Sequence, residues 1–131
     1  MNSVELKTFK CTPNKFTQFA EDLIHGVHNF LYDRLKVALC SESPLDTDET
    51  LGDLKEIDYT NLTNRDLVDL SKDTVLSAVG PVEGFRYVVV YNDSALRDSL
   101  ICWYDLDETI TLTDGSTFTI KFSENEIFQI R

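Results

Sequence analysis

The spacing of apolar residues predicts one helix near the N-terminus. After Pro13, apolar side chains recur every three or four residues, at Phe16, Phe19, Ala20, Leu23, Ile24 and Val27. This is the period of an amphipathic helix, which we place at residues 14–28. We expect its apolar stripe to cover one face or edge of a sheet.

Other apolar patterns predict strands. Residues 35–40 alternate in the manner of a half-buried strand. Residues 85–91 are almost continuously apolar, as in a strand covered on both faces, and residues 100–104 are its expected antiparallel partner. Further strands are predicted at residues 74–79, 108–113, 116–122 and 127–130. Between them, residues 41–52 are typical of a solvated loop, and residues 61–73 fit either a helical turn or a strand followed by a loop.

The C-terminal strands allow a prediction of register. Ile110 and Leu112 share one face of their strand, and Phe118 and Ile120 share one face of the next. Directly paired residues lie on the same side of a sheet, so the apolar sets oppose each other only across an odd-length loop. We therefore predict a three-residue loop at residues 113–115. Its Gly115 would be left-handed, and Phe118 would lie opposite Ile110.

These elements predict the fold class. The 131 residues suffice for a single domain with its own core, spanning 1–131. We expect a mainly β fold: an antiparallel β-sandwich or jelly-roll-like domain with one N-terminal amphipathic helix.

The charge balance narrows the classes of partner. The chain has 12 Lys and Arg against 23 Asp and Glu, a formal net charge of −11. Direct nucleic-acid binding is disfavoured because phosphate contacts need clustered basic side chains, and docking on a basic surface is favoured. No segment approaches the roughly 18 consecutive apolar residues of a membrane span. Residues 1–10 lack the apolar core of a signal peptide, so we expect synthesis in the cytoplasm of the host.

An acidic segment is the most specific candidate for chemistry. Asp105-Leu106-Asp107-Glu108-Thr109 follows an apolar strand and matches the Asp-x-Asp-x-Thr signature of haloacid-dehalogenase-type phosphotransferases. There, the first Asp attacks phosphorus and the second handles the leaving-group proton. That fold also needs a following helix and a long α/β body, but only 22 residues follow Thr109. We therefore interpret the segment as an acidic turn between two strands.

Two further groups have the residue types of metal ligands. Glu21, His25 and His28 lie at i, i+4 and i+7 of the predicted helix, on a face that we expect to be exposed to solvent. Residues 46–49 contain Asp46, Asp48 and Glu49 but lack the central glycine and the ligand spacing of a calcium loop. A polar helix face and an acidic surface loop are the preferred interpretations.

Cysteines and aromatic residues complete the candidates. The three cysteines are far apart in the sequence and are interpreted as reduced, structural thiols (Cys11, Cys40 and Cys102). Five strand aromatics are candidates for a ligand-stacking platform, although strand aromatics usually belong to a core (Phe85, Tyr87, Tyr91, Trp103 and Tyr104). We predict no catalytic, cofactor-binding or metal-binding residue.

Three C-terminal segments, residues 84–93, 100–104 and 110–122, carry a specific sequence likeness, and weaker likeness occurs at residues 26–30, 35–39 and 54–57. Through these segments, about two thirds of the chain resembles a family of small virion proteins of tailed bacteriophages. The resemblance implies a non-enzymatic structural protein located in the virion. A capsid decoration or cement protein is the first choice, with the major capsid protein as partner and a homo-oligomer as the expected state. A tail component, or a virion protein that binds a receptor or glycan, is the alternative.

Overall fold

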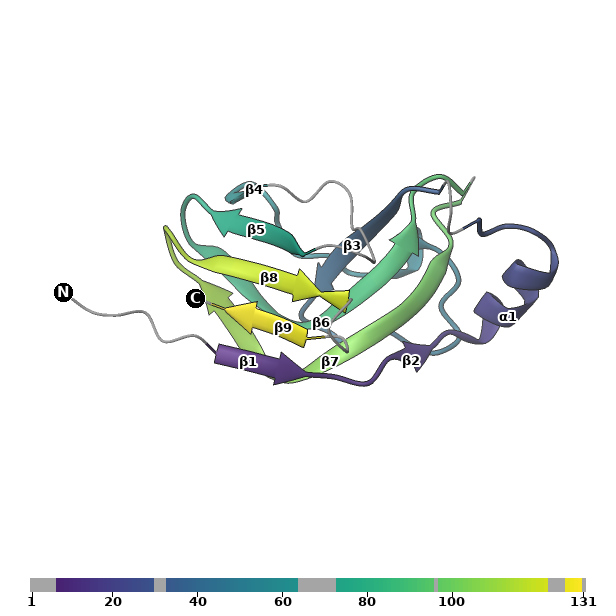
Figure 1. Cartoon of the computed structure of the whole chain (residues 1–131), viewed down its shortest axis with the longest axis horizontal. Coiled ribbons are helices and arrows are strands. Elements are labelled where there is room, and N and C mark those ends of the chain that lie inside the picture. The colour runs from purple at the N-terminus through teal and green to yellow at the C-terminus, as the bar shows by residue number, and fades with distance from the viewer. Residues whose placement is uncertain (1–6, 30–32, 64–72, 96, 123–126, 131) are drawn as a thin grey trace.

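The fold is a two-layer antiparallel β-sandwich with one N-terminal helix, in the class that the sequence predicts (Figure 1). The computed structural model describes residues 7–29, 33–63, 73–95, 97–122 and 127–130. Most of the ambiguous segment 61–73 lies outside these ranges. Within them, the chain forms nine strands, one α-helix and one 3-10 helix.

The strands divide into a five-stranded and a four-stranded sheet. The five-stranded sheet has the order β1 (Lys7–Lys10), β9 (Ile127–Ile130), β8 (Thr117–Lys121), β5 (Thr74–Ala78) and β4 (Leu62–Thr63). The four-stranded sheet has the order β2 (Asn14–Lys15), β7 (Leu100–Leu112), β6 (Val82–Asn92) and β3 (Leu35–Cys40). The short strands β1 and β2 were not predicted from the sequence, whereas β4 lies in residues 61–73, where a strand followed by a loop was one of two alternatives.

One long hairpin, folded over on itself, forms the centre of both sheets. β6 pairs with β7 in one sheet and β5 pairs with β8 in the other. The strand register is the same on both sides of the bend, because Val82 lies opposite Leu112 and Ser77 lies opposite Thr117. The two corners are residues 79–81 and 113–116. Hydrogen bonds from Ala78 to Ser116 and from Gly115 to Ala78 hold these corners side by side.

The predicted hairpin between residues 108–113 and 116–122 is therefore wrong. β7 and β8 belong to different sheets, so Phe118 lies opposite Leu76 and Ile130 rather than Ile110. The connection has four residues, 113–116, and Gly115 has the expected left-handed conformation, with φ +88°. The apolar faces do meet, but across the interior between the sheets: the rings of Phe118 and Phe85 pack edge to face with centroids 5.3 Å apart.

A second correction concerns the strands expected at residues 100–104 and 108–113. They form one continuous strand, β7, which pairs with β6 on both sides of the acidic segment. Tyr87 pairs with Asp105 and Phe85 pairs with Ile110, so four residues of β7 lie opposite the single residue Arg86. The acidic segment is thus a bulge within a strand and not a turn between strands.

The helix is shorter than the predicted span of residues 14–28. Helix α1 covers Thr17–Ile24, while residues 14 and 15 form β2. Gly26 is left-handed, with φ +72°, and the N–H groups of Gly26 and Val27 donate to the carbonyls of Leu23 and Asp22. This is a Schellman C-cap, which ends the helix at a point that apolar spacing does not reveal.

The four-stranded sheet is buried on both faces. Its inner face meets the five-stranded sheet around three fully buried rings, Phe85, Phe118 and Phe128. Its outer face carries a second cluster that includes Ala38, Cys40, Val89, Tyr91 and Leu100, covered by Phe16 and by Leu51 and Leu54. The strand at residues 85–91 is therefore covered on both faces, as predicted. The strand at residues 35–40 is also covered on both faces, although it was expected to be half-buried.

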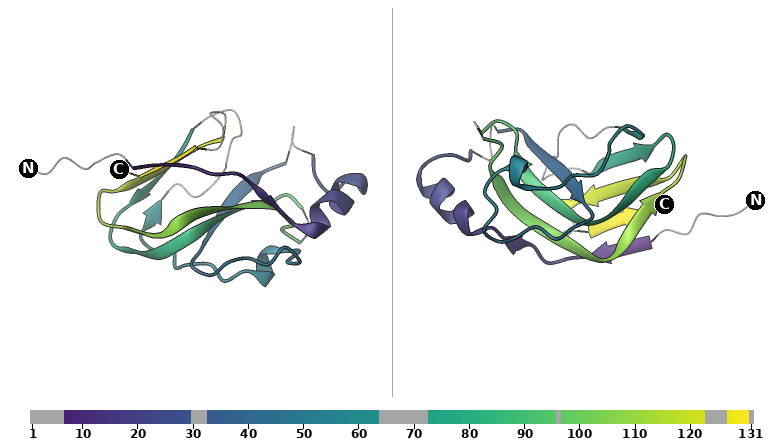
Figure 2. Two further views of the ribbon diagram at one scale, coloured as in Figure 1. Left: turned by 90° about the horizontal axis from the view of Figure 1, so that it is seen from below. Right: turned by 180° about the vertical axis from the view of Figure 1, so that it is seen from behind.

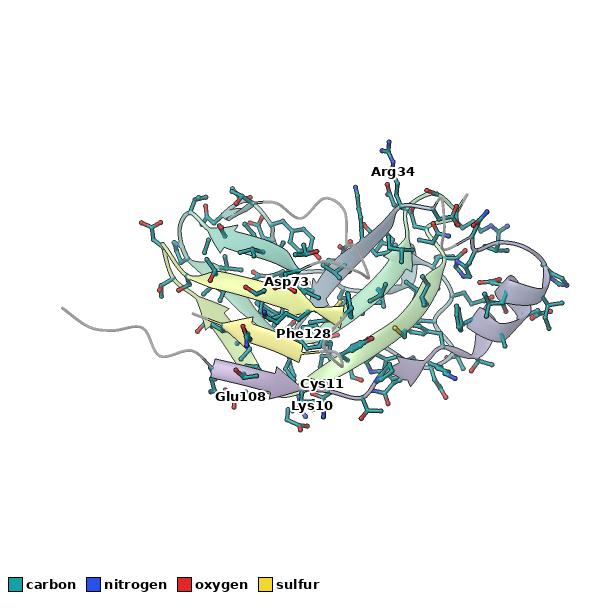
Figure 3. All side chains as sticks on the ribbon, in the orientation of Figure 1. Lys10, Cys11, Arg34, Asp73, Glu108 and Phe128 are labelled. Carbon is teal, nitrogen blue, oxygen red and sulfur yellow. The ribbon has the colours of Figure 1, made fainter. Side chains whose placement is uncertain are left out.

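The N-terminal segment closes one side of the sandwich. β1 pairs with β9 in one sheet and β2 pairs with β7 in the other, so the chain runs along both sheets before it reaches α1 (Figure 2). Lys7 forms an ion pair with Glu108 of the β7 bulge, which lies beside β1 (Figure 3). The Cys11 thiol donates to the carbonyl of Asp105.

Candidate functional site

The acidic bulge of β7 uses its first carboxylate internally. The guanidinium of Arg86 donates to both carboxylate oxygens of Asp105, with N–O distances of 2.7 and 3.0 Å. The backbone N–H of Asp107 donates to the same carboxylate at 2.8 Å. The hydrogen bond from Arg86 is the largest cause that lowers the pKa of Asp105. Asp107, at φ +65°, has an almost fully exposed side chain, whose oxygen is 3.9 Å from the Arg86 guanidinium.

This geometry explains the segment without phosphoryl transfer. A nucleophilic carboxylate needs an accessible lone pair aimed at substrate, whereas Asp105 is held in a bidentate ion pair within an antiparallel strand. Both Asp105 and Arg86 help to fix a bulge in which several residues lack a direct cross-strand partner. In this segment, the Asp105 carboxylate stabilises the local backbone of the bulge through its bonds to Arg86 and to the Asp107 N–H.

The three candidate metal ligands of the N-terminal region do not converge. Glu21 and His25 are exposed, whereas His28 follows the helix and is only 8% exposed. His28 was expected on the exposed helix face. It is buried because the Schellman turn at Gly26 redirects the chain toward the end of β6. Within the described residues, no group of three or more His, Cys, Asp or Glu side chains is arranged to hold a metal ion.

His28 belongs to a buried polar cluster that ties the helix to the β6–β7 turn. Its Nδ1 lies 3.0 Å from the amide nitrogen of Asn92, a fully buried residue, and its Nε2 lies 3.9 Å from a carboxylate oxygen of Asp22. The Asn92 amide also donates to Asp33 at 2.6 Å. Burial lowers the pKa of His28, while the nearby carboxylates of Asp22 and Asp33 oppose that shift. The cluster orders the backbone at this end of the molecule.

The acidic loop is held by its own carboxylates. Asp53 accepts from the N–H groups of Glu49 and Thr50 and completes a capping box with Thr50, and these backbone bonds lower the pKa of Asp53. Asp48 accepts from the N–H of Leu45 at 2.9 Å. These two carboxylates therefore act as turn and cap acceptors rather than as a preformed set of calcium ligands.

Cysteines and aromatic residues are mostly packed in the cores. None of the three cysteines forms a disulfide, and burial, as the largest cause, raises the pKa of Cys40 to about 12. The five candidate aromatics do not share one platform. Phe85 and Tyr104 lie in the core between the sheets, whereas Tyr87, Tyr91 and Trp103 belong to the outer cluster.

The residues that sequence patterning placed wrongly are on α1. Its inward side consists of Phe19, which packs against the core, and Asp22, the one buried residue of the helix. Leu23 and Ile24 of the predicted inward stripe are 42% and 81% exposed. Leu45 of the acidic loop is also exposed, at 62%. The apolar period correctly indicates a helix, but it does not indicate which side meets the sheet.

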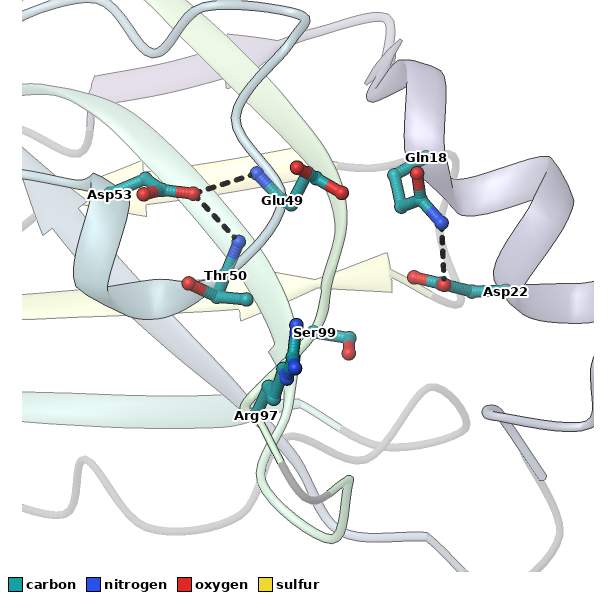
Figure 4. A pocket seen from close by; sticks show the side chains of 7 residues that line it. All are labelled: Gln18, Asp22, Glu49, Thr50, Asp53, Arg97 and Ser99. Carbon is teal, nitrogen blue, oxygen red and sulfur yellow. Dashed lines mark hydrogen bonds between the residues drawn. The ribbon is translucent and has the colours of Figure 1, made fainter.

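A shallow polar cavity separates α1 from the acidic loop (Figure 4). Its volume is about 290 Å³, and it is lined by Gln18, Asp22, Glu49, Thr50, Asp53, Arg97 and Ser99. The Gln18 amide donates to Asp22 at 3.2 Å, and the loop is joined to the helix start by a 2.8 Å bond from the Thr17 N–H to the Asp46 carbonyl. We call this part of the molecule, residues 16–29 and 41–54, the helix end.

Comparisons of the chain with protein-family models, with curated proteins and with solved structures gave no match. The class of molecule defined here is therefore the fold itself, a two-sheet antiparallel sandwich. The phage resemblance remains a prediction. Among the described residues, no helix combines the length and the apolar character needed to cross a bilayer.

Proposed function

We propose that this chain is a non-enzymatic structural protein of a bacteriophage virion, and specifically a capsid decoration or cement protein. It would bind the outer shell in many copies, as a homo-oligomer, and stabilise the junctions between major capsid protein subunits. The virion assignment is supported by the resemblance of residues 84–93, 100–104 and 110–122 to small phage virion proteins. These residues lie in the long folded hairpin that forms the centre of both sheets.

The observation that carries the non-enzymatic part of the proposal is the state of Asp105. The one carboxylate in a recognisable catalytic motif is bonded by Arg86 through both oxygens. The candidate ligands Glu21, His25 and His28 point to different environments, and Asp48 and Asp53 bond to loop backbone. Within the described residues, Asp105, His28, Asp48 and Asp53 thus have local structural roles, which supports a protein that acts by binding.

The proposal is tested by locating and restoring the protein. Labelling microscopy on purified particles should place the chain on the capsid surface. Shells assembled without it should bind the added protein and regain resistance to heat. Label confined to the tail would favour the tail component instead, and absence of the chain from particles would contradict both versions.

The proposed oligomer has a separate measurement. Analytical ultracentrifugation of the purified chain should give a mass above that of one chain, and a monomer at all accessible concentrations would contradict this part of the proposal.

A further inference from the structure

The outer side of α1 has an unusual distribution of side chains for a helix on a sandwich. A surface helix normally buries its apolar stripe and exposes its charges. Here, Asp22 is inside while Leu23 and Ile24 are outside, and Ile24 is the most exposed of the large apolar side chains described. On its inward side, the helix is held by the packing of Phe19 and by the Asp22–His28 contact. This anchoring leaves two apolar side chains on the last turn facing solvent.

The segments that carry these apolar side chains have a strong excess of negative charge. Residues 16–29 and 41–54 contain no Lys or Arg and seven acidic residues: Glu21, Asp22, Glu42, Asp46, Asp48, Glu49 and Asp53. Five of them, Glu21, Glu42, Asp46, Glu49 and Asp53, are exposed. Glu42 pairs with Lys55 and Asp53 accepts from loop backbone, whereas the carboxylates of Glu21, Asp46 and Glu49 form no ion pair or hydrogen bond within the described ranges. Arg97 lines the cavity beside these segments. The helix end therefore combines exposed apolar side chains with an excess of acidic ones.

The cations of the chain are a poor match for the helix end. Five of the nine Lys and Arg residues in the described ranges already pair with carboxylates of the same chain (Lys7, Lys36, Lys55, Arg86 and Lys121), and the chain as a whole has a net charge of −11. A symmetric contact between two helix ends would bring the same carboxylates face to face, which costs free energy. Anionic nucleic acid and anionic lipid are disfavoured for the same reason. Charge complementarity thus selects a basic protein surface.

We propose that the helix end docks on a basic protein surface with an apolar centre, using Leu23, Ile24 and Leu45 as the buried contacts and Glu21, Asp46 and Glu49 as the charged rim. This inference rests on the proposed function and names the surface by which the chain would bind the shell. Apolar side chains at the centre of an interface carry most of its affinity, whereas rim charges set association rate and salt dependence.

The test compares matched variants in binding to shells that lack the chain, measured by co-sedimentation. Leu23→Ser/Ile24→Ser should weaken binding by about tenfold or more. The control is Val75→Ser/Val79→Ser, a pair of similarly exposed apolar residues on or next to β5, 43% and 58% exposed. This control should bind as the wild type does. Both double variants change exposed positions, so urea denaturation should show the wild-type midpoint for each.

A second pair of variants tests the charged rim. Neutralising Glu21, Asp46 and Glu49 (E21Q, D46N, E49Q) should slow association several-fold and flatten its salt dependence between about 50 and 300 mM NaCl. The control is Asp114→Asn, a single exposed charge in the β7–β8 corner, at the opposite end of the molecule (Figure 1). It should leave both quantities almost unchanged.

The outcomes distinguish a failure of the proposed docking surface from a failure of the proposed function. If wild-type protein binds shells and the Leu23/Ile24 variant binds equally well, this inference is wrong while the proposed function stands. Equal weakening by the Val75/Val79 pair would also overturn it. If wild-type protein binds no shells, the cement function fails, and the docking inference fails with it.

Discussion

The five-stranded sheet and the helix end follow opposite rules of side-chain placement. In the sheet, alternation puts Leu76, Phe118, Ile120 and Phe128 inside, and its strands carry three Lys and no Asp or Glu. At the helix end, an acidic side chain is inside and apolar side chains are outside. The first arrangement is determined by the need to fill the space between two sheets. In the second, the inward Asp22 holds the helix through His28, but the outward Leu23 and Ile24 contribute no burial to the isolated chain, which is why we interpret them as part of a binding surface.

The largest expected effect follows from truncating the shared core. Phe118 is fully buried, packs edge to face on Phe85 and stacks at 5.9 Å on Phe128. Phe118→Ala should lower the free energy of unfolding by about 3–5 kcal/mol, because it removes buried apolar area and leaves a cavity. Ile24→Ala should change it by less than about 0.5 kcal/mol. Urea denaturation of both variants measures the contrast, and similar losses would contradict it.

The buried polar cluster should give the next largest effect. Asn92→Ala removes the amide that bonds Asp33 and contacts His28, and it also removes the acceptor for the Ser94 N–H. Leaving these groups without their partner should cost about 1–3 kcal/mol of stability. Asn14→Ala is the control, because Asn14 is exposed and its amide makes only a long 3.5 Å bond. Thermal unfolding should separate the two variants clearly, and equal midpoints would exclude a structural role for the cluster.

The corner of the folded hairpin should depend on a glycine. Gly115 has φ +88°, and an added Cβ would meet no atom within 4 Å. Gly115→Ala should therefore cost about 1 kcal/mol from backbone strain alone. Gly52→Ala is the matched control, because Gly52 has no left-handed backbone and its nearest Cβ contact is ordinary, at 3.8 Å. Chemical denaturation measures this difference in the free energy of unfolding. A larger loss for Gly52→Ala than for Gly115→Ala would contradict the strain that we assign to the corner.

The smallest effect is a pH dependence from His28. Burial lowers the pKa of His28 below 6.5, against opposing effects of Asp22 and Asp33. The stability that neutral His28 contributes is complete above 6.5 and is lost as pH falls toward the lower folded value. Unfolding measured between about pH 7.5 and about pH 5 should show this decline, and His28→Asn should reduce it. His25→Asn, at an exposed position, should retain it; a decline unchanged in His28→Asn would contradict the assignment.

Short-range patterning predicted the elements well, but not how the strands are joined into sheets. The alternation at residues 35–40 and the apolar run at residues 85–91 located β3 and β6, because burial in a sheet has a strict period. Ile110 and Phe118 do belong to the same buried cluster, although they do not pair. Sequence could not tell whether the two apolar faces meet along one ladder or across two layers, since both arrangements bury them. Residues 79–81 and 113–116 bend the hairpin at the same place. This pairing of the two corners is a tertiary contact, which local sequence patterns do not show.

The helix end was the least predictable part for a similar reason. The spacing of Phe16 to Val27 fits one apolar stripe, but the Schellman turn at Gly26 ends the helix early and brings His28 into the buried polar cluster at the end of β6. The glycine itself was a visible signal for that end. Asp22 accepts an i,i+4 hydrogen bond from Gln18 and contacts His28, and the His28 contact depends on the turn at Gly26 rather than on the helical period.

The most direct test of the proposed docking surface is a hydrogen-exchange footprint of the chain, free and bound to shells. We expect new protection at residues 16–29 and 41–54 and no change in β5 and β8. Protection confined to the strands of the five-stranded sheet, with the helix end unchanged, would contradict it.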